Sequence, residues 1–518
     1  MYSSLSRYLT WIPPRDRTFL LIITVIGFII RIWDLGRPSL WYDEVLTLHR
    51  SESLFEESEG LLLRPPFYYF LCWLFIQLFG ASEASIRLPS AIFGTLTIPL
   101  VYIFTARIQR NVTENQPILA ATFLTIFPLH IAVSREAKEY ALLTFLVLLV
   151  MFLAIEAIHH QSLILVVIGA FVQALAFFTN FLALPSFFLI CTFLWLKWPK
   201  QQGINRLDKG SISATGIFGL LPTIIYGFWL LLPREGFHEP TKGLGISNWL
   251  GFENAYWYLL LLFLYIGGGF FFVFKALLDW RNKGEGQVLV FAYYVLIFLV
   301  LSIYRLKAQR YFAIAIPITV ILLAEGIQWV YSNIHVNSSE FSTKKVQSLV
   351  IAILISSTIL MPVLFLLGFF VGGTQMGYHP DWRGACNYVK TNSDSETDTF
   401  WSTHGTTRIA AHYLGEEYQI GDVTELEDNF SSLQGTSPSW IWIIVTKNRF
   451  ERKIFQELQE WIRAEASLVW DTRAEDVSTQ MLANAADNIF RPLGINTLSW
   501  WSLDRMRVYR IQSSHSEV

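Results

Sequence analysis

The chain has 518 residues, of which 53% are hydrophobic and 16% aromatic, and its mean hydropathy is +0.41. This composition is typical of an integral membrane protein, and a formal net charge of −2 gives no indication of nucleic-acid binding. The three cysteines, Cys72, Cys191 and Cys386, lie far apart, and none shares a metal-type spacing with another cysteine or a histidine. The sequence therefore predicts neither a zinc site nor a disulfide framework.

Long apolar runs predict membrane-spanning helices, because about 20 helical residues cross a hydrocarbon core of ~30 Å. The runs that we interpret as spans lie at 18–33, 88–106, 117–133, 139–158, 162–179, 182–197, 211–232, 255–276, 287–304, 309–330 and 347–371. No small-residue cleavage pattern follows the first run, which favours a retained span over a removed signal peptide. We therefore expect about 11 transmembrane helices.

A shorter run, FYYFLCWLFIQLF at 67–79, has 13 residues and is too short to cross the membrane comfortably. The basic segments at 197–209 and 275–283, and the amino terminus, should all be cytoplasmic by the positive-inside rule. The amino terminus and the segment 197–209 lie on the same side of the membrane only if residues 67–79 do not span it. We therefore expect this segment to form a helix at the outer interface, with the carboxyl-terminal tail extracytoplasmic.

The chain becomes polar after residue 372. We expect residues 1–375 to form the membrane domain, with a first outer loop at 34–87, and residues 376–518 to form a small α/β or α+β extracytoplasmic domain. The elements expected in this tail are helices at 383–391 and 450–464 and strands at 439–446 and 506–511.

The stretch LWYDEVLTLHR at 40–50 places two adjacent carboxylates, Asp43 and Glu44, just after the first span. The predicted topology puts SREAKEY (134–140) and IYRLKAQRY (303–311) on the same membrane face. These two segments contribute Arg135, Glu136, Lys138, Arg305, Lys307 and Arg310. Charged groups at membrane depth are expensive and usually functional. Carboxylates among cations suit an anionic lipid-phosphate ligand beside a general base.

Each of these groups also has a structural interpretation. Asp43 and Glu44 could cap an interfacial helix, because acids favour helix amino termini. The cations of 303–311 could be snorkelling anchors for lipid headgroups. The charged residues of 134–140 could form an internal ion-pair cluster.

Four segments in chain order, LWYDE, RPPFYYFLCWLFIQLFG, ASIRLPSAIFGTLTIPLVYIFTARI and SREAKEYALL, resemble the membrane glycosyltransferases of the GT-C fold. The similarity is to dolichyl-phosphate-mannose protein mannosyltransferases and bacterial lipid A aminoarabinose transferases. It covers roughly residues 18–185, and RYFAIAIP at 310–317 and DWRGACNYV at 381–389 extend it.

The resemblance implies a polytopic helical protein with juxtamembrane helices in the first outer loop, in a cell membrane such as the plasma membrane of a bacterium. It also implies an inverting enzyme that moves a sugar from a polyprenyl-phosphate carrier to an acceptor hydroxyl on the extracytoplasmic face. The partners would be that lipid-linked donor, membrane lipid and a glycan, lipid or protein acceptor. The sequence requires no metal or cofactor and leaves a divalent cation open.

In that family the acid of the first loop is the catalytic base, and its position matches Asp43. Glu44 and Glu136 are the further acids, and Lys138 stands where relatives often carry Arg. The cations expected at the donor phosphate are Arg310, Arg305, Lys307, Lys138 and Arg64, where Arg64 replaces the family's usual His or Lys. The other residues expected in the pocket are Tyr42, Tyr140, Asn180 and Tyr311, where Asn180 stands in a segment in which some relatives carry a His–Tyr pair.

Three other functions stay open. A transporter or flippase of a lipid-linked glycan would have similar hydropathy, but no second copy of the 40–90 pattern is present to suggest paired repeats. A polysaccharide ligase would use a polyprenyl diphosphate at a similarly basic site. A sensor would need far fewer spans. For the acceptor we favour an envelope glycan or lipid over a protein.

Overall fold

The computed structural model describes residues 12–55, 65–108, 115–198, 209–231, 257–279, 284–303, 308–337, 349, 351–360, 362–363, 380–403, 406–426, 440–446, 460, 462, 466–471 and 506–512. The chain divides into two compact units. The helical unit comprises residues 1–33, 50–81 and 85–366, and the sheet unit comprises residues 34–49, 82–84 and 367–518.

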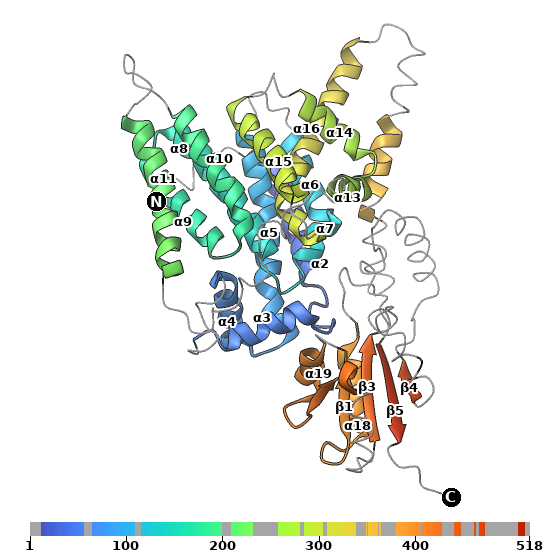
Figure 1. Cartoon of the computed structure of the whole chain (residues 1–518). Helices are drawn as coiled ribbons and strands as arrows, with labels where there is room; N and C mark the ends of the chain where they lie inside the picture. The colour runs from blue at the N-terminus through green and yellow to red at the C-terminus, as the bar shows by residue number, and fades with distance from the viewer. Residues whose placement is uncertain are drawn as a thin grey trace, which may run out of the picture. The chain divides into compact units, whose positions relative to one another are not determined.

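The described part of the helical unit is built from apolar helices. In chain order these are α2 (Pro14–Ile32), α4 (Phe67–Phe79), α5 (Glu83–Ile108), α6 (Gln116–Ile126), α7 (Pro128–Val133), α8 (Tyr140–His160), α9 (Leu163–Phe177), η1 (Phe181–Ala183), α10 (Leu184–Lys197), α11 (Lys209–Leu231), α13 (Trp257–Ile266), α14 (Gly269–Leu278), α15 (Glu285–Ile303), η3 (Gln309–Ala315) and α16 (Ile316–Asn337). A further helix occupies Ile351–Leu360. Helices α8, α9, α10 and α11 lie side by side (Figure 1).

Five helices within the described residues are long and apolar enough to cross a membrane. They are Glu83–Ile108, Tyr140–His160, Lys209–Trp229, Glu285–Ile303 and Gln309–Ser332. The total of eleven spans stays a prediction. The expected short helix at 67–79 is confirmed as α4, which ends where Gly80 adopts a φ of +79°; its place at the membrane interface stays a prediction.

Two of the expected spans each contain two helices. The run 117–133 divides into α6 and α7 at Phe127, whose backbone is extended, because Pro128 cannot continue the hydrogen-bonding pattern of α6. The run 255–276 breaks at Gly267, which has a φ of +49°. The N–H of Gly268 donates to Ser357 Oγ over 3.1 Å, and a Cβ at Gly268 would lie 2.3 Å from that oxygen. Glycine is needed here both for backbone conformation and for close approach.

The turn between α8 and α9 follows from its own residues. Gln161 adopts the left-handed conformation and ends α8. Ser162 then caps α9, because its side chain accepts a hydrogen bond from the N–H of Leu165. This tight connection makes α8 and α9 antiparallel neighbours.

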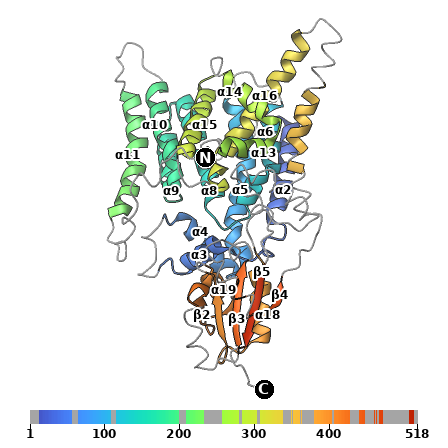
Figure 2. The ribbon, with the colours of Figure 1, turned by 45° about the vertical axis from the view of Figure 1, so that its right-hand side comes forward.

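The sheet unit holds a five-stranded sheet in the order β2-β1-β3-β5-β4 (Figure 2). The strands are β1 (Thr399–Ser402), β2 (Ile420–Asp422), β3 (Trp440–Thr446), β4 (Ser467–Asp471) and β5 (Met506–Gln512). Strand β1 is parallel to β2 and β3, whereas β5 is antiparallel to β3 and β4. Helices α18 (Trp382–Asn392) and α19 (Thr407–Leu414) pack against each other and against the sheet.

Local sequence patterns account for most of this unit. The β-prone run at 439–446 forms the central strand β3, in which residues 441–445 are buried, and the expected helix at 383–391 is α18. The buried Asp398 carboxylate accepts from Trp440 N and from Trp442 Nε1, at 3.0 and 2.9 Å. Most of the expected helix at 450–464 lies outside the described residues.

The first predicted outer loop, 34–87, is divided between the two units. Residues 34–49 belong to the sheet unit, together with residues 82–84. Helix α3 (Tyr42–Glu52) has residues in both units. The expected domain boundary at 375 lies outside the described residues and stays a prediction.

Candidate functional site

Helix α3 positions the acidic pair of the sheet unit. Its first helical residue is Tyr42, which makes Asp43 the second and Glu44 the third. Asp43 is half-buried and Glu44 is fully buried. The two adjacent acids therefore have different surroundings, although the sequence does not distinguish them.

Glu44 has a capping role. Its Oε2 accepts a hydrogen bond from the N–H of Trp41, the residue before the helix, at 3.4 Å. This is the acidic half of a capping box, in which a third-position carboxylate reaches back to the residue that caps the helix. The interpretation of these acids as helix caps thus applies to Glu44. Asp43 is only half-buried.

The start of α8 gathers a cation and two tyrosines of the helical unit. The rings of Tyr140 and Tyr311 lie 5.8 Å apart between centroids. The guanidinium carbon of Arg310 lies 6.0 Å from the Tyr140 ring and 5.9 Å from the Tyr311 ring. The Tyr140 hydroxyl also interacts with the Arg310 side chain. Helix η3 thereby brings two of the expected site residues, Arg310 and Tyr311, to a third, Tyr140, at the start of α8.

A carboxylate that the sequence analysis did not assign completes this group. Glu139 immediately precedes Tyr140, and its Oε1 accepts from Asn180 Nδ2 at 3.0 Å. Glu139 interacts electrostatically with Tyr140, as Arg310 does. The signal for Glu139 was present in SREAKEY, where it is the second acid, but the resemblance directed attention to Glu136.

Residues 134–138 have mixed roles. The Arg135 guanidinium donates to the carbonyls of Ile30, Arg31 and Trp33, at 3.1, 3.0 and 2.7 Å. These carbonyls end α2, where a cation is favoured by the helix dipole, so Arg135 has a structural role as a helix C-cap.

Lys138 is buried and Glu136 is half-buried. The backbone of this turn is fixed because Lys138 O accepts from Ser90 Oγ at 2.9 Å. The Ser90 hydroxyl is in turn hydrogen-bonded to Tyr68 Oη at 2.7 Å. The turn therefore has a defined conformation beside the start of α8.

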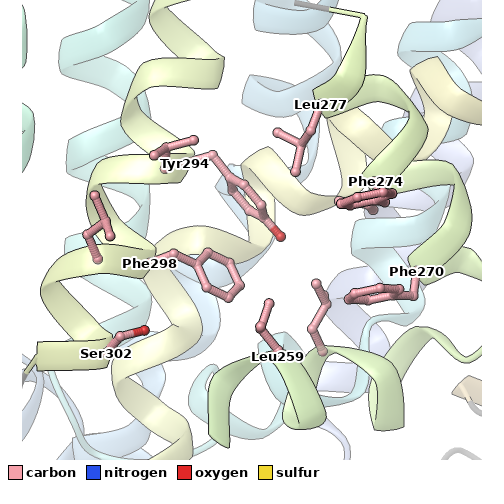
Figure 3. A pocket seen from close by; sticks show the side chains of 11 residues that line it. Leu259, Phe270, Phe274, Leu277, Tyr294, Phe298 and Ser302 are labelled. Carbon is pink, nitrogen blue, oxygen red and sulfur yellow. The ribbon is translucent and has the colours of Figure 1, made fainter. Parts of the chain in front are cut away.

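A cavity of about 280 Å³ lies among α13, α14 and α15. Figure 3 shows rings of Phe270, Phe274, Tyr294 and Phe298 around it. The Tyr294 hydroxyl accepts from Thr319 Oγ1 at 3.2 Å. These almost entirely apolar walls suit a hydrocarbon group and offer no acid or base for chemistry.

Residues 63–226 match the family of dolichyl-phosphate-mannose-protein mannosyltransferases. This match covers less than half of the chain. An uncharacterized protein of Aquifex aeolicus (strain VF5) is 24% identical over 329 residues, which are 60% of this chain and 64% of that protein. The putative mannosyltransferase YkcB of Bacillus subtilis (strain 168) is 26% identical over 187 residues, or 34% of this chain and 26% of that protein. This chain thus spans under two thirds of the length of each of these two relatives.

Solved structures establish the fold of the chain. ArnT from Cupriavidus metallidurans bound to undecaprenyl phosphate matches with a TM-score of 0.59 and 14% identity, over 96% of this chain and 98% of that chain. The apo oligosaccharyltransferase of Archaeoglobus fulgidus matches with a TM-score of 0.53 and 12% identity, over 82% of this chain and 69% of that chain. The predicted GT-C fold is confirmed, and the chain is a multi-pass membrane protein.

Not every expected residue of the glycosyltransferase site lies in the described part. Arg64, Arg305 and Lys307 lie outside the described residues. Asp43 belongs to the sheet unit and Arg310 to the helical unit, so the proximity of these two side chains stays a prediction. Among the described residues, no group of three or more His, Cys, Asp or Glu side chains could hold a metal ion.

Proposed function

We propose that this glycosyltransferase transfers a sugar, with inversion, from a polyprenyl-phosphate carrier to an acceptor hydroxyl at the extracytoplasmic membrane face. The acceptor is an envelope glycan or lipid rather than a protein. The reaction needs no cofactor, and whether a divalent cation contributes is tested by adding a chelator. The family match over 63–226 supports this proposal, as does the similar fold of ArnT, which was solved with undecaprenyl phosphate.

One observation carries the proposal. The helical unit gathers Arg310, Tyr140 and Glu139 at the beginning of α8, although Arg310 lies far from the other two in the sequence. A guanidinium offers several donors in a rigid fork that matches a phosphate. A carboxylate next to it can accept hydrogen bonds from sugar hydroxyls. A guanidinium and a carboxylate side by side can therefore bind both parts of a sugar phosphate, the phosphate and the sugar.

Asp43 is the general base of the proposed reaction. Its carboxylate accepts the proton of the acceptor hydroxyl while that oxygen forms a bond to the anomeric carbon. The bond between the anomeric carbon and the phosphate oxygen breaks, and its electron pair leaves with the lipid phosphate. Arg310 then stabilises the charge that develops on the phosphate. The partial exposure of Asp43, in contrast to the buried Glu44, supports this assignment.

Carrier release tests the reaction. Purified full-length protein in nanodiscs would be incubated with synthetic polyprenyl-phosphate sugars and candidate acceptors, and the carrier would be followed by mass spectrometry. We expect release of polyprenyl monophosphate. Release of a diphosphate would support the ligase alternative, and an intact carrier–sugar bond after translocation would support the transporter alternative.

The base assignment has a matched control. Asp43→Asn should lower kcat by about 10²–10⁴-fold, the usual contribution of a general base. Asp34→Asn should leave kcat unchanged, because Asp34 is exposed, pairs with Arg37, and has a positive φ that asparagine tolerates. A wild-type rate for Asp43→Asn would show that another group removes the proton.

Sidedness is tested by labelling introduced cysteines in intact cells. We expect a membrane-impermeant maleimide to modify Arg37→Cys from outside and Gly203→Cys only after lysis. Burial raises the pKa of the native Cys386 thiol to about 12, so this thiol should contribute little background, since the thiolate is the reactive form. External labelling of Gly203→Cys would contradict the proposed orientation.

A further inference from the structure

The segment that leads into α3 is held by α19 of the sheet unit. The backbone N–H of Leu40 donates to Tyr413 Oη at 2.6 Å, and Leu40 itself is buried. A backbone N–H can only donate, so the Tyr413 hydroxyl oxygen is the acceptor. This bond ties a residue of α19 to the residue two positions before α3.

Glu83 orients that tyrosine. The Tyr413 hydroxyl lies 3.2 Å from Glu83 Oε1 and donates to it, because the carboxylate oxygen is an acceptor. The same oxygen accepts from Arg383 Nη2. A hydroxyl that accepts from one group and donates to another has a fixed orientation. The bond to Glu83 therefore directs the Tyr413 hydroxyl hydrogen away from Leu40, so that the oxygen can accept from the Leu40 N–H.

Arg383 fixes the preceding residues of the same segment. Its backbone N–H donates to Ser39 Oγ at 3.1 Å. Its guanidinium donates to the carbonyls of Gly36 and Arg37, at 3.1 and 3.5 Å. Three residues of the segment 36–39 are therefore hydrogen-bonded to one residue at the start of α18.

These contacts set the direction in which α3 begins. Leu40 is followed by Trp41, whose N–H is held by the Glu44 carboxylate, and Asp43 stands between the two. With Leu40 held on one side and the Glu44 cap on the other, the first turn of α3 has little freedom. The position of the Asp43 carboxylate then depends on the sheet unit.

We infer that Tyr413, Arg383 and Glu83 form a clamp that positions the Asp43 carboxylate for proton transfer. They are positioning residues, because they contact the 36–40 segment and act through it. The inference rests on the proposed function for the role of Asp43. It gives the tail a task in the transfer step.

Two measurements on the full-length protein test the clamp. Tyr413→Phe removes one hydroxyl and keeps the ring, and Tyr418→Phe is the matched control. The Tyr418 ring packs on Phe400, and among the described residues its hydroxyl makes no hydrogen bond. Hydrogen–deuterium exchange of peptides covering 36–45 reports the clamp itself, and steady-state transfer with a polyprenyl-phosphate sugar reports its consequence.

For Tyr413→Phe we expect exchange at Leu40 to rise at least tenfold and kcat to fall ten- to a hundredfold, with the donor KM within twofold of wild type. A misplacement of about 1 Å in a catalytic group can cost that much. With kcat normalised to the concentration of folded enzyme, a loss of kcat without a change in KM indicates an interaction made in the transition state. Arg383→Gln should behave similarly and Arg383→Lys should recover part of the rate, whereas Arg408→Gln, on the exposed face of α19, should change neither measurement.

The outcomes separate the clamp from the proposed function. Unchanged exchange in Tyr413→Phe would show that no clamp exists in solution. Faster exchange with an unchanged kcat would show that the clamp does not position Asp43. If Asp43→Asn retained the wild-type rate, the base assignment would fail, while the exchange measurement would still decide whether the segment is clamped.

Discussion

The side-chain amide of Asn180 donates a hydrogen bond to Glu139 Oε1 across 3.0 Å and joins the start of α8 to the turn before η1. The orientation of this amide is determined, because Asn180 Oδ1 accepts from the N–H of Leu182 at 3.0 Å. The Glu139 carboxylate is thus held by one oxygen beside Tyr140.

Asn180→Asp is expected to lower transfer at least tenfold. It places a second carboxylate at hydrogen-bonding distance from Glu139, where like charges repel, and it removes a hydrogen bond to a carboxylate worth about 1.5–3 kcal/mol. Steady-state kinetics measure the effect, and Asn387→Asp on the exposed face of α18 is the control.

The double variant Asn180→Asp/Glu139→Gln restores an amide–carboxylate pair with the roles exchanged. We expect it to recover the thermal stability lost in Asn180→Asp but not the transfer rate, because the carboxylate has moved away from Tyr140. Recovery of both properties would show that the pair serves only the fold.

Glu44→Ala should lower stability more than Asp43→Ala. The Glu44 side chain caps α3 and is buried, and loss of a helix cap costs about 0.5–2 kcal/mol. Chemical denaturation of the purified protein followed by sheet-unit fluorescence measures the difference. Glu44→Gln should be close to wild type, since glutamine also completes a capping box; an equal loss in Glu44→Gln and Glu44→Ala would contradict the capping role.

Arg310→Gln should lower kcat/KM for the donor by about 10²–10³-fold, as expected when one group that stabilises transition-state charge is removed. Arg310→Lys should recover only part of this, because lysine keeps the charge but loses the planar fork that packs against Tyr140 and Tyr311. Donor titrations measure the change. Arg15→Gln, an exposed arginine of α2, should leave kcat/KM at the wild-type value, and an equal loss there would indicate a general charge effect.

The sheet unit should lose stability as the pH falls below about 6.5. Burial, the neighbouring His49 and Arg383 hold the pKa of His412 below its ordinary value, although Glu83 acts in the opposite direction. In the unfolded chain His412 regains its ordinary pKa of about 6.5 and binds a proton that the folded state resists. Stability is therefore fully present above that pH and declines below it.

Hydrogen–deuterium exchange of β1 and β3 between pH 7.5 and 5.5 measures this decline. His412→Gln should make the decline shallower, because the substituted side chain does not titrate. The ring of His412 lies 6.2 Å from that of His49. His49→Gln should also reduce the slope, because His49 contributes to the lowered pKa of His412. An unchanged slope in His412→Gln would assign the pH dependence to other groups.

The sequence by itself determined the local elements. The 13-residue run at 67–79 is a helix with the expected bounds, and the β-prone run at 439–446 is the central strand. Helix α18 also lies where the pattern predicts it. Such features depend on the length and hydrophobicity of neighbouring residues, which a sequence states directly. The ordered motifs of the first 185 residues likewise indicated the glycosyltransferase fold.

The tertiary structure decided what each charged side chain does. Nothing in the letters DE shows that Glu44 is buried as a cap while Asp43 is partly exposed, because this depends on the direction in which α3 leaves Leu40. Glu139 is a candidate because its carboxylate is hydrogen-bonded to Asn180 and because Arg310 lies near the ring of the adjacent Tyr140. The division of the first loop between two units was also not predictable, since it depends on Tyr413 and on contacts between residues more than 300 positions apart. Hydrophobic patterns specify which face of an element is buried, but not which distant backbone donor or carboxylate it will meet.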